Sequence, residues 1–198
     1  MYNVNLIDLL NKIRMFIALD IYSKDTLLKL QEELIAVSGW LQHKIKPVEK
    51  ENFHFTIIFL GEVDLRIIDE LGKKLSELEF DPIKVTYTGI GVFPNSDFPR
   101  IIWVGVDERS KQKIVSLFES ITSKIRDLGF KPDKQFTPHI TLFRNKMERK
   151  ENLHLDNIFP KYKNKVFGFD VIDKIQLKRS DLTALGPVYS NMFTIHAK

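Results

Sequence analysis

Hydrophobic and polar positions follow the same order in two separate parts of the chain. In the first part, residues 15–19 form a short apolar run, and apolar side chains then recur at every third or fourth position over residues 27–41. A β-rich run follows over residues 52–60. Apolar spacing of three to four residues is typical of a helix, so the pattern predicts a strand, a helix and a strand, with Ser23 as the N-cap.

The second part repeats this order. Residues 101–106 form an apolar run, residues 111–128 carry apolar side chains at helical spacing, and Gly129 follows them. Residues 136–143 form another β-rich run. Because glycine is favoured immediately after a helix, the pattern again predicts strand, helix and strand.

The two units span residues 15–61 and 100–144, and a histidine stands at the same distance from the first strand in each. These residues are His54 and His139. Internal repetition of a supersecondary unit predicts a fold built from two related halves.

The segments outside the repeats predict further helices and strands. Residues 65–78 have helical spacing, residues 83–92 alternate as a strand, and residues 145–165 are charged, which favours a loop with a short helix. Residues 167–177 and 188–195 indicate the last two strands.

Together these elements predict the α+β class and a bilobal, duplicated fold. Two antiparallel sheets are expected to face a central cleft, with the helices outside. No linker rich in Gly, Pro or Ser separates the halves, so residues 15–198 are expected to form one domain. Residues 1–14 are an N-terminal extension that either forms an amphipathic helix or precedes a start at Met15.

The candidate chemistry lies in the second strand of each unit, where the pattern His-x-Thr occurs twice. Side chains two positions apart share one face of a strand, so His54 and Thr56 point together, and so do His139 and Thr141. If a pseudo-two-fold axis relates the repeats, each half contributes one imidazole and one hydroxyl to a shared cleft. A motif this short is weak evidence for a site when it occurs once. Its occurrence at matched positions of both units strengthens the prediction.

Strict alternation also predicts which side chains of these strands point away from the cleft and into the core. Phe55, Ile57 and Phe59 are expected to point into the core of the first half, and Ile140 and Leu142 into the core of the second.

Two imidazoles and two hydroxyls suit acid–base chemistry at phosphorus. An imidazole with a pKa near 6.5 can accept a proton at neutral pH, while a partner held protonated by a phosphate donates one. The Thr hydroxyls are expected to bond the phosphate oxygens. Arg144 is a further candidate, although alternation from His139 places it on the opposite face, so its use requires a β-bulge or a strand end.

Composition narrows the alternatives. The chain has no Cys, which excludes thiol catalysis, thiolate zinc sites and disulfides, and which fits a cytoplasmic protein. No apolar run approaches the ~18 residues of a membrane span, and the N-terminus lacks the basic region of a secretory signal. The formal net charge of +4 favours a phosphate-bearing or polyanionic partner.

The combined motifs resemble the 2H phosphoesterase superfamily, and within it the RNA 2′,3′-cyclic phosphodiesterases, historically called 2′-5′ RNA ligases. The resemblance covers the chain from about Met15 to the C-terminus. It rests on the segments Met-Phe-Ile-Ala-Leu-Asp (15–20), Asn-Phe-His-Phe-Thr (52–56), Phe-Leu-Gly (59–61), Trp-Val-Gly-Val (103–106), Phe-Thr-Pro-His-Ile-Thr-Leu (136–142) and Gly-Pro-Val-Tyr (186–189).

The resemblance implies an enzyme that opens a terminal RNA 2′,3′-cyclic phosphate to a 2′-phosphomonoester without metal or cofactor. It implies that His54 protonates the departing 3′ oxygen, that His139 activates water, and that Thr56 and Thr141 hold the phosphate. Relatives have an Arg shortly after the second motif, which supports Arg144. The implied partners are RNA ends or nucleotides with a 2′,3′-cyclic phosphate, tRNA halves among them. The resemblance also implies a cytoplasmic monomer and a reverse reaction that is 2′-5′ ligation.

Two other functions remain open at this point. The same groove, with exposed aromatic side chains, would serve a nucleotide or RNA-end binding module without turnover. A di-histidine metal site is less favoured, because no carboxylate accompanies either motif at ligand spacing. The other histidines, His43, His154 and His196, have no partner in the repeat and are interpreted as structural or solvent-facing.

Overall fold

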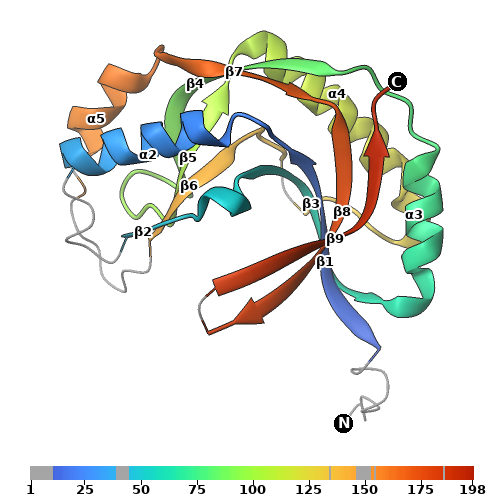
Figure 1. Cartoon of the computed structure of the whole chain (residues 1–198). Helices are drawn as coiled ribbons and strands as arrows, with labels where there is room; N and C mark the ends of the chain where they lie inside the picture. The colour runs from blue at the N-terminus through green and yellow to red at the C-terminus, as the bar shows by residue number, and fades with distance from the viewer. Residues whose placement is uncertain (1–10, 39–44, 134, 146–152, 154, 185) are drawn as a thin grey trace.

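The computed structural model describes residues 11–38, 45–133, 135–145, 153, 155–184 and 186–198. Within them, nine strands form one antiparallel sheet, with the order β7-β4-β5-β6-β3-β1-β8-β9 and with β2 paired to β6. The sheet curls strongly, and helices cover its outer side (Figure 1). The predicted α+β class is therefore confirmed.

The duplication is visible in the order of the elements. The first unit consists of β1 (Lys12–Asp20), α2 (Lys24–Ser38) and β3 (His54–Asp64), and the second of β5 (Ile101–Val106), α4 (Glu108–Lys124) and β6 (Ile140–Asn145). In each unit the two strands pair antiparallel with each other. The remaining elements are β2 (Ile45–Pro47), α3 (Ile68–Ser76), β4 (Ile83–Phe93), α5 (Leu155–Tyr162), β7 (Val166–Ile172), β8 (Lys174–Thr183) and β9 (Gly186–His196).

The expectation of two separate sheets is wrong. The two halves meet where β3 pairs with β6, through the single residue pair Phe55 and Ile140. This pair joins the free edge of one half to that of the other, because a strand edge inside the protein needs partners for its N–H and C=O groups. One sheet therefore runs through both halves.

The C-terminal strands and the start of the sheet also differ from expectation. The segment predicted as one strand over residues 167–177 is interrupted at Asp173, so β7 ends at Ile172 and β8 begins at Lys174. Strand β1 begins at Lys12 and pairs there with Asp64, so residues 12–14 belong to the sheet and not to a helix. Residues 1–10 lie outside the described part of the chain.

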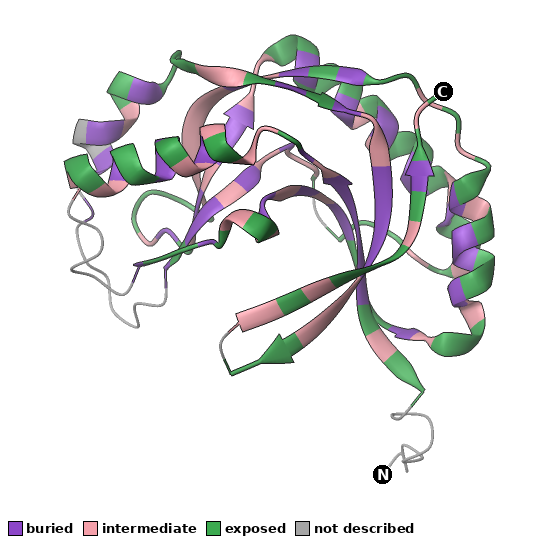
Figure 2. Cartoon of the chain, in the orientation of Figure 1, coloured by how far each residue is buried: buried purple, intermediate pink, exposed green. Residues whose placement is uncertain are grey.

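The core lies between the sheet and its helices. Figure 2 shows the buried residues concentrated along the strands and on the helix faces turned toward them, with the exposed residues on the outward faces. Helices α2 and α5 pack near β7 and β4, while α3 packs on β9 and against α4. Among the described residues, no helix is both long and apolar enough to cross a bilayer.

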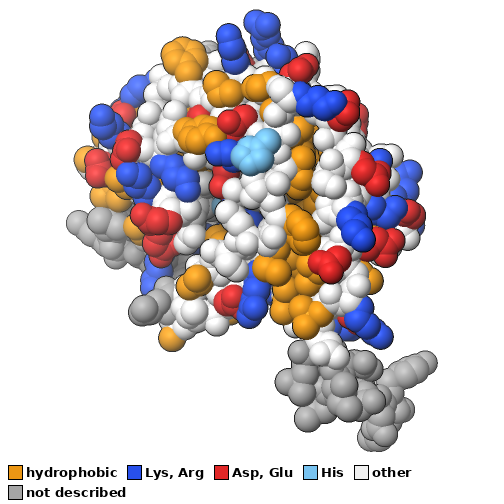
Figure 3. Space-filling model, turned by 45° about the vertical axis from the view of Figure 1, so that its right-hand side comes forward, with side chains coloured by type: hydrophobic (Ala, Val, Ile, Leu, Met, Phe, Trp, Pro, Cys, Tyr) orange, Lys and Arg blue, Asp and Glu red, His pale blue; other side chains and the backbone are white. Residues whose placement is uncertain are grey.

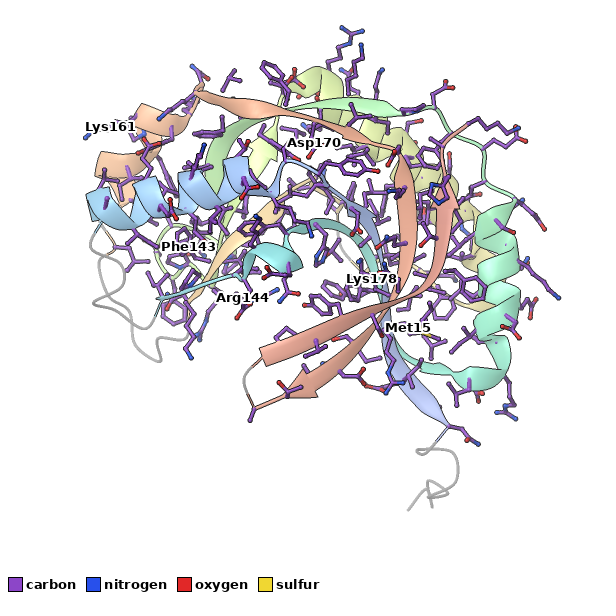
Figure 4. All side chains as sticks on the ribbon, in the orientation of Figure 1. Met15, Phe143, Arg144, Lys161, Asp170 and Lys178 are labelled. Atoms are coloured by element: carbon purple, nitrogen blue, oxygen red, sulfur yellow. The ribbon has the colours of Figure 1, made fainter. Side chains whose placement is uncertain are left out.

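One buried carboxylate connects β7 to the junction between β1 and α2. Asp170 Oδ2 accepts hydrogen bonds from Tyr22 N at 3.0 Å, Ser23 N at 2.8 Å and Tyr87 Oη at 2.7 Å. Asp170 is 8% exposed and is labelled in Figure 4. Ser23, predicted as an N-cap, directs its hydroxyl to the carbonyl of Phe169.

We expect Asp170→Ala to lower the free energy of unfolding by about 2–4 kcal/mol, because it leaves one buried and two partly buried donors without an acceptor. Asp173→Ala is the matched control, since the carboxylate of Asp173 accepts from Tyr22 Oη in an exposed position, and its loss should change the free energy of unfolding by less than about 0.5 kcal/mol. Urea unfolding of both variants measures the difference. Equal losses would contradict a special role for Asp170.

Candidate active site

A cavity of about 220 Å³ opens on the concave side of the sheet, where the two halves meet. All five residues predicted for the site line it: His54, Thr56, His139, Thr141 and Arg144. The remaining wall comes from β2 and the turn after it, and from the tip of the β8–β9 hairpin, which contributes Tyr189.

The register of the sheet explains why the two motifs converge. Phe55 and Ile140, the central residues of the two His-x-Thr motifs, are the residues that pair across the seam, and their side chains are buried on the other side of the sheet. In an antiparallel pair the neighbours of paired residues lie opposite each other in reverse order. His54 is therefore placed on the side of Thr141, and His139 on the side of Thr56.

His54 is half-buried between aromatic rings. Its ring centroid lies 5.2 Å from that of Phe16 and 5.5 Å from that of Tyr189, and its Nε2 lies 3.0 Å from Thr56 Oγ1. Burial lowers the pKa of His54 to about 4, and the positive charges of Lys178 and Arg144 act in the same direction. The free protein thus holds His54 neutral at pH 7.

A partly buried ion pair lies beside His54. Lys178 Nζ lies 3.1 Å from Asp20 Oδ1 and donates to Asn191 Oδ1 at 2.8 Å, and Asp20 is the register partner of His54 on β1. The negative charge of Asp20 raises the pKa of His54 and so opposes Lys178. Lys178 was not predicted for the site, since β8 lies outside both repeats and its register against β1 has no signal in the sequence.

His139 is oriented by the backbone. Its Nδ1 lies 2.7 Å from the carbonyl oxygen of Thr137, so Nδ1 carries the proton and donates, and Nε2 is the acceptor. Phe93 and Trp103 pack on the ring with centroid distances of 4.9 and 5.9 Å. Gly91 makes room for the indole, because a Cβ there would lie 2.2 Å from it. Burial lowers the pKa of His139, and the charge of Arg144 adds to the effect.

A β-bulge brings Arg144 to the cavity. Trp103 pairs with Thr141 but Ile102 pairs with Phe143, so Leu142 is an extra residue in β6. One extra residue reverses the alternation beyond it, and Arg144 consequently shares a face with Thr141. In Figure 4, Arg144 and Lys178 lie on opposite sides of the concave face.

Gln31 of α2 holds this bulge in place. Its Nε2 donates to the carbonyl oxygen of Leu142 at 2.7 Å and to that of Val48 at 3.0 Å, and Val48 N donates to Leu142 O at 2.8 Å. Gln31 is 3% exposed. The amide therefore ties the bulge to the cavity wall after β2, and a polar residue on the apolar face of α2 was the only sign of it in the sequence.

The corresponding bulge in the first half overturns one expectation. Ala18 pairs with Thr56 but Ile17 pairs with Ile58, so Ile57 is the extra residue in β3. Phe59 was expected in the core, yet its side chain is 72% exposed, because the bulge moves it to the concave face.

Among the described residues, His196 and the surface charges form no second site of this kind. His196 is exposed on β9, and His43 and His154 lie outside the described residues. No three His, Asp or Glu side chains of the described chain are grouped as a metal-binding cluster. On the face shown in Figure 3, Lys and Arg are interspersed with Asp and Glu.

Known proteins share this sequence pattern along almost the whole chain. The model of the LigT like Phosphoesterase family matches residues 21–103 and again residues 104–189. The chain belongs to the LigT-like phosphoesterase family. The boundary between the two matches falls inside β5, and each match contains one of the two His-x-Thr motifs.

Relatives of similar sequence over most of their length include named enzymes. The RNA 2′,3′-cyclic phosphodiesterase of Archaeoglobus fulgidus is 36% identical over 181 residues, which cover 90% of this chain and 97% of that protein. The enzyme of the same name from Methanocaldococcus jannaschii is 38% identical over 178 residues, with 89% and 96% covered. The hydrolase class expected from the sequence is thereby confirmed.

Solved structures share this fold. The protein TT0787 of Thermus thermophilus has a TM-score of 0.73 at 25% identity, with 93% of this chain and 97% of that chain covered. The E. coli LigT structure complexed with 3′-AMP has a TM-score of 0.68 at 19% identity, with 94% and 99% covered.

The cations of this LigT-like cavity should act selectively on the two imidazoles. Removing a positive charge stabilises an imidazolium, so Arg144→Met is expected to raise the pKa of both His54 and His139, and Lys178→Met that of His54 alone. NMR titration of the ring signals measures both values. Lys161→Met, at the far end of α5 in Figure 4, should change neither. A Lys178→Met variant that shifts the pKa of His139 as strongly as that of His54 would contradict this assignment.

Loss of the Gln31 amide should weaken both the fold and the cavity. Gln31→Leu is expected to lower the free energy of unfolding by about 1–3 kcal/mol and to weaken binding of inorganic phosphate, because the bulge that orients Arg144 loses its donor. Urea unfolding and phosphate titration measure the two effects.

The matched control is Gln176→Leu. Gln176 is also buried, but its Oε1 has no hydrogen-bond partner in the described structure. Its replacement should therefore lower the free energy of unfolding by less than that of Gln31. Unchanged phosphate binding in Gln31→Leu would show that Arg144 keeps its place without the amide.

Proposed function

We propose that the chain hydrolyses RNA terminal 2′,3′-cyclic phosphates to 2′-phosphomonoesters by a two-histidine acid–base mechanism. The observation that carries the proposal is the placement of two imidazoles, each with a hydroxyl beside it, on the two sides of the pair Phe55–Ile140 in one cavity. The names of relatives at 36% and 38% identity support the substrate class. The 3′-AMP complex of E. coli LigT supports a nucleotide in the cavity.

The orientation of His139 supports its role as general base. Because Nδ1 donates to Thr137 O, the lone pair of Nε2 is available, and the lowered pKa keeps it unprotonated at pH 7. In the proposed step His139 Nε2 takes a proton from water as the water oxygen forms a bond to phosphorus.

His54 is the proposed general acid. The bond from phosphorus to O3′ breaks opposite the attacking water, and His54 transfers its proton to O3′, which leaves a 3′-hydroxyl and a 2′-phosphate. A bound phosphate anion offsets the charges of Arg144 and Lys178, and Asp20 already favours the imidazolium, so substrate binding raises the pKa of His54 from about 4. Proton exchange with solvent then returns His54 and His139 to their starting protonation states.

Three polar groups are proposed to hold the phosphate. The Thr56 and Thr141 hydroxyls donate to the non-bridging oxygens, and the guanidinium of Arg144 stabilises the charge that develops on them. With a 5′-hydroxyl in place of water, His139 takes the proton of that hydroxyl as O5′ bonds to phosphorus and the bond from phosphorus to O3′ breaks, which is 2′-5′ ligation.

We expect His54→Ala and His139→Ala each to lower kcat about 10² to 10⁴-fold on a cyclic-phosphate-ended oligonucleotide in the presence of chelator. His196→Ala, an exposed histidine on β9, is the control and should retain full activity. Chromatography that separates 2′- from 3′-phosphate identifies the product. Tight binding of the 2′-phosphate without turnover by the unmodified protein would instead favour the binding module.

A further inference from the structure

The most exposed large hydrophobic side chain in the described structure stands on the concave face, near the cavity but outside its wall. Phe59 is 72% exposed, and its register partner on β1 is Phe16, with ring centroids 6.0 Å apart. Phe16 itself is 2% exposed. Phe59 thus offers one free ring face and is supported from the side by a buried ring.

An aromatic surface connects this ring to the reacting groups. Phe16 lies 4.9 Å from Tyr189 and 5.2 Å from His54, measured between ring centroids. Phe59 lies beyond Phe16 as seen from His54, and the two ring distances place its centroid no more than about 11 Å from that of His54. Tyr189 lines the cavity wall 5.5 Å from His54, and Phe59 does not line it. The base of the nucleotide held at His54 therefore has its nearer ring in Tyr189, which leaves Phe59 to the next base.

Positive charge lies beyond the aromatic surface. Arg14 precedes Phe16 by two positions on β1 and therefore shares its face, and Lys12, Arg14 and Arg179 line a shallow hollow there together with the carboxylates of Glu62 and Asp181. Arg14 lies 3.9 Å from Glu62, an exposed contact of little energetic weight. A base-stacking ring followed by cations is the arrangement by which proteins hold unpaired nucleic acid.

We propose that Phe59 is a stacking platform for the base of the nucleotide that precedes the cyclic-phosphate end, and that Arg14 faces the phosphate linking that nucleotide to the chain. The proposal rests on the function proposed above. It makes the preferred substrate a single-stranded RNA end of two or more nucleotides and not a mononucleotide.

The test compares a nucleoside 2′,3′-cyclic phosphate with an oligonucleotide that carries the same terminal nucleotide. Phe59→Ala should lower kcat/KM about fivefold or more on the oligonucleotide, since stacking of one base is worth about 1–3 kcal/mol, and should leave the mononucleotide rate within about twofold. Phe59→Trp should restore the oligonucleotide rate. Equal losses on both substrates, or none on either, would overturn the platform.

Phe169→Ala is the matched control. Phe169 is 70% exposed on β7, at the opposite end of the sheet order from β8 and β9, and its loss should change neither rate. An oligonucleotide with an abasic penultimate position adds a thermodynamic cycle: it should reproduce the loss in the unmodified protein and cause no further loss in Phe59→Ala. Additive losses would overturn the proposal.

Failure of the proposed function has a separate signature. If the unmodified protein hydrolyses neither substrate, the acid–base proposal fails, and fluorescence titration with a 2′-phosphate-ended oligonucleotide then tests the platform alone. Weaker binding by Phe59→Ala but not by Phe169→Ala would support the platform, and equal affinity of all three proteins would overturn it.

Discussion

The antiparallel pair between Phe55 and Ile140 is the contact on which the site depends. It is the single described residue pair between β3 and β6, and it joins the two duplicated halves into one sheet. Because each member is the central residue of a His-x-Thr motif, pairing them in any other register would move at least one imidazole away from the cavity. The buried side of the same pair is secured by stacking of Phe55 on Tyr87, at 6.4 Å between ring centroids.

Much of this arrangement could be predicted from the sequence, since it depends on period and repetition. The helical spacing in both units, the matched positions of His54 and His139, and the alternation that puts each Thr beside its His are local patterns. They indicated the α+β class, the duplication and the set of side chains that line the cavity.

The features that escaped prediction are those in which the alternation breaks or distant strands meet. The bulge residues Ile57 and Leu142 look like ordinary strand residues, and each reverses the faces of the residues after it. The single sheet and the position of Lys178 depend on registers between strands far apart in the chain. The role of Gln31 could not be predicted, because its acceptors are backbone carbonyls, which every residue has.

Electrostatics give the free cavity a consistent preference for an anion. Burial and the cations Arg144 and Lys178 all lower the pKa of His54, and burial and Arg144 lower that of His139. Both rings are therefore neutral in the free protein at pH 7. A bound phosphate offsets part of the positive charge of the cations and so raises the pKa of the rings. Only His54 has an acidic neighbour, Asp20, among the groups that act on its pKa, so the two imidazoles respond unequally to the same anion.

The symmetry of the duplication fails at one further position, and the failure fits an asymmetric substrate. Phe59 and Arg144 stand at the same place in their halves, five residues after the histidine and two after the extra residue of the bulge. Both bulges turn this position toward the concave face, so the fold presents an aromatic ring on one side and a guanidinium on the other. A cyclic phosphate at the end of an RNA strand has the same polarity, with anionic oxygens at one end and stacked bases leading away from the other. Equivalent acid–base groups at the centre, flanked by unlike groups at equivalent outer positions, are what such a substrate requires of a duplicated protein.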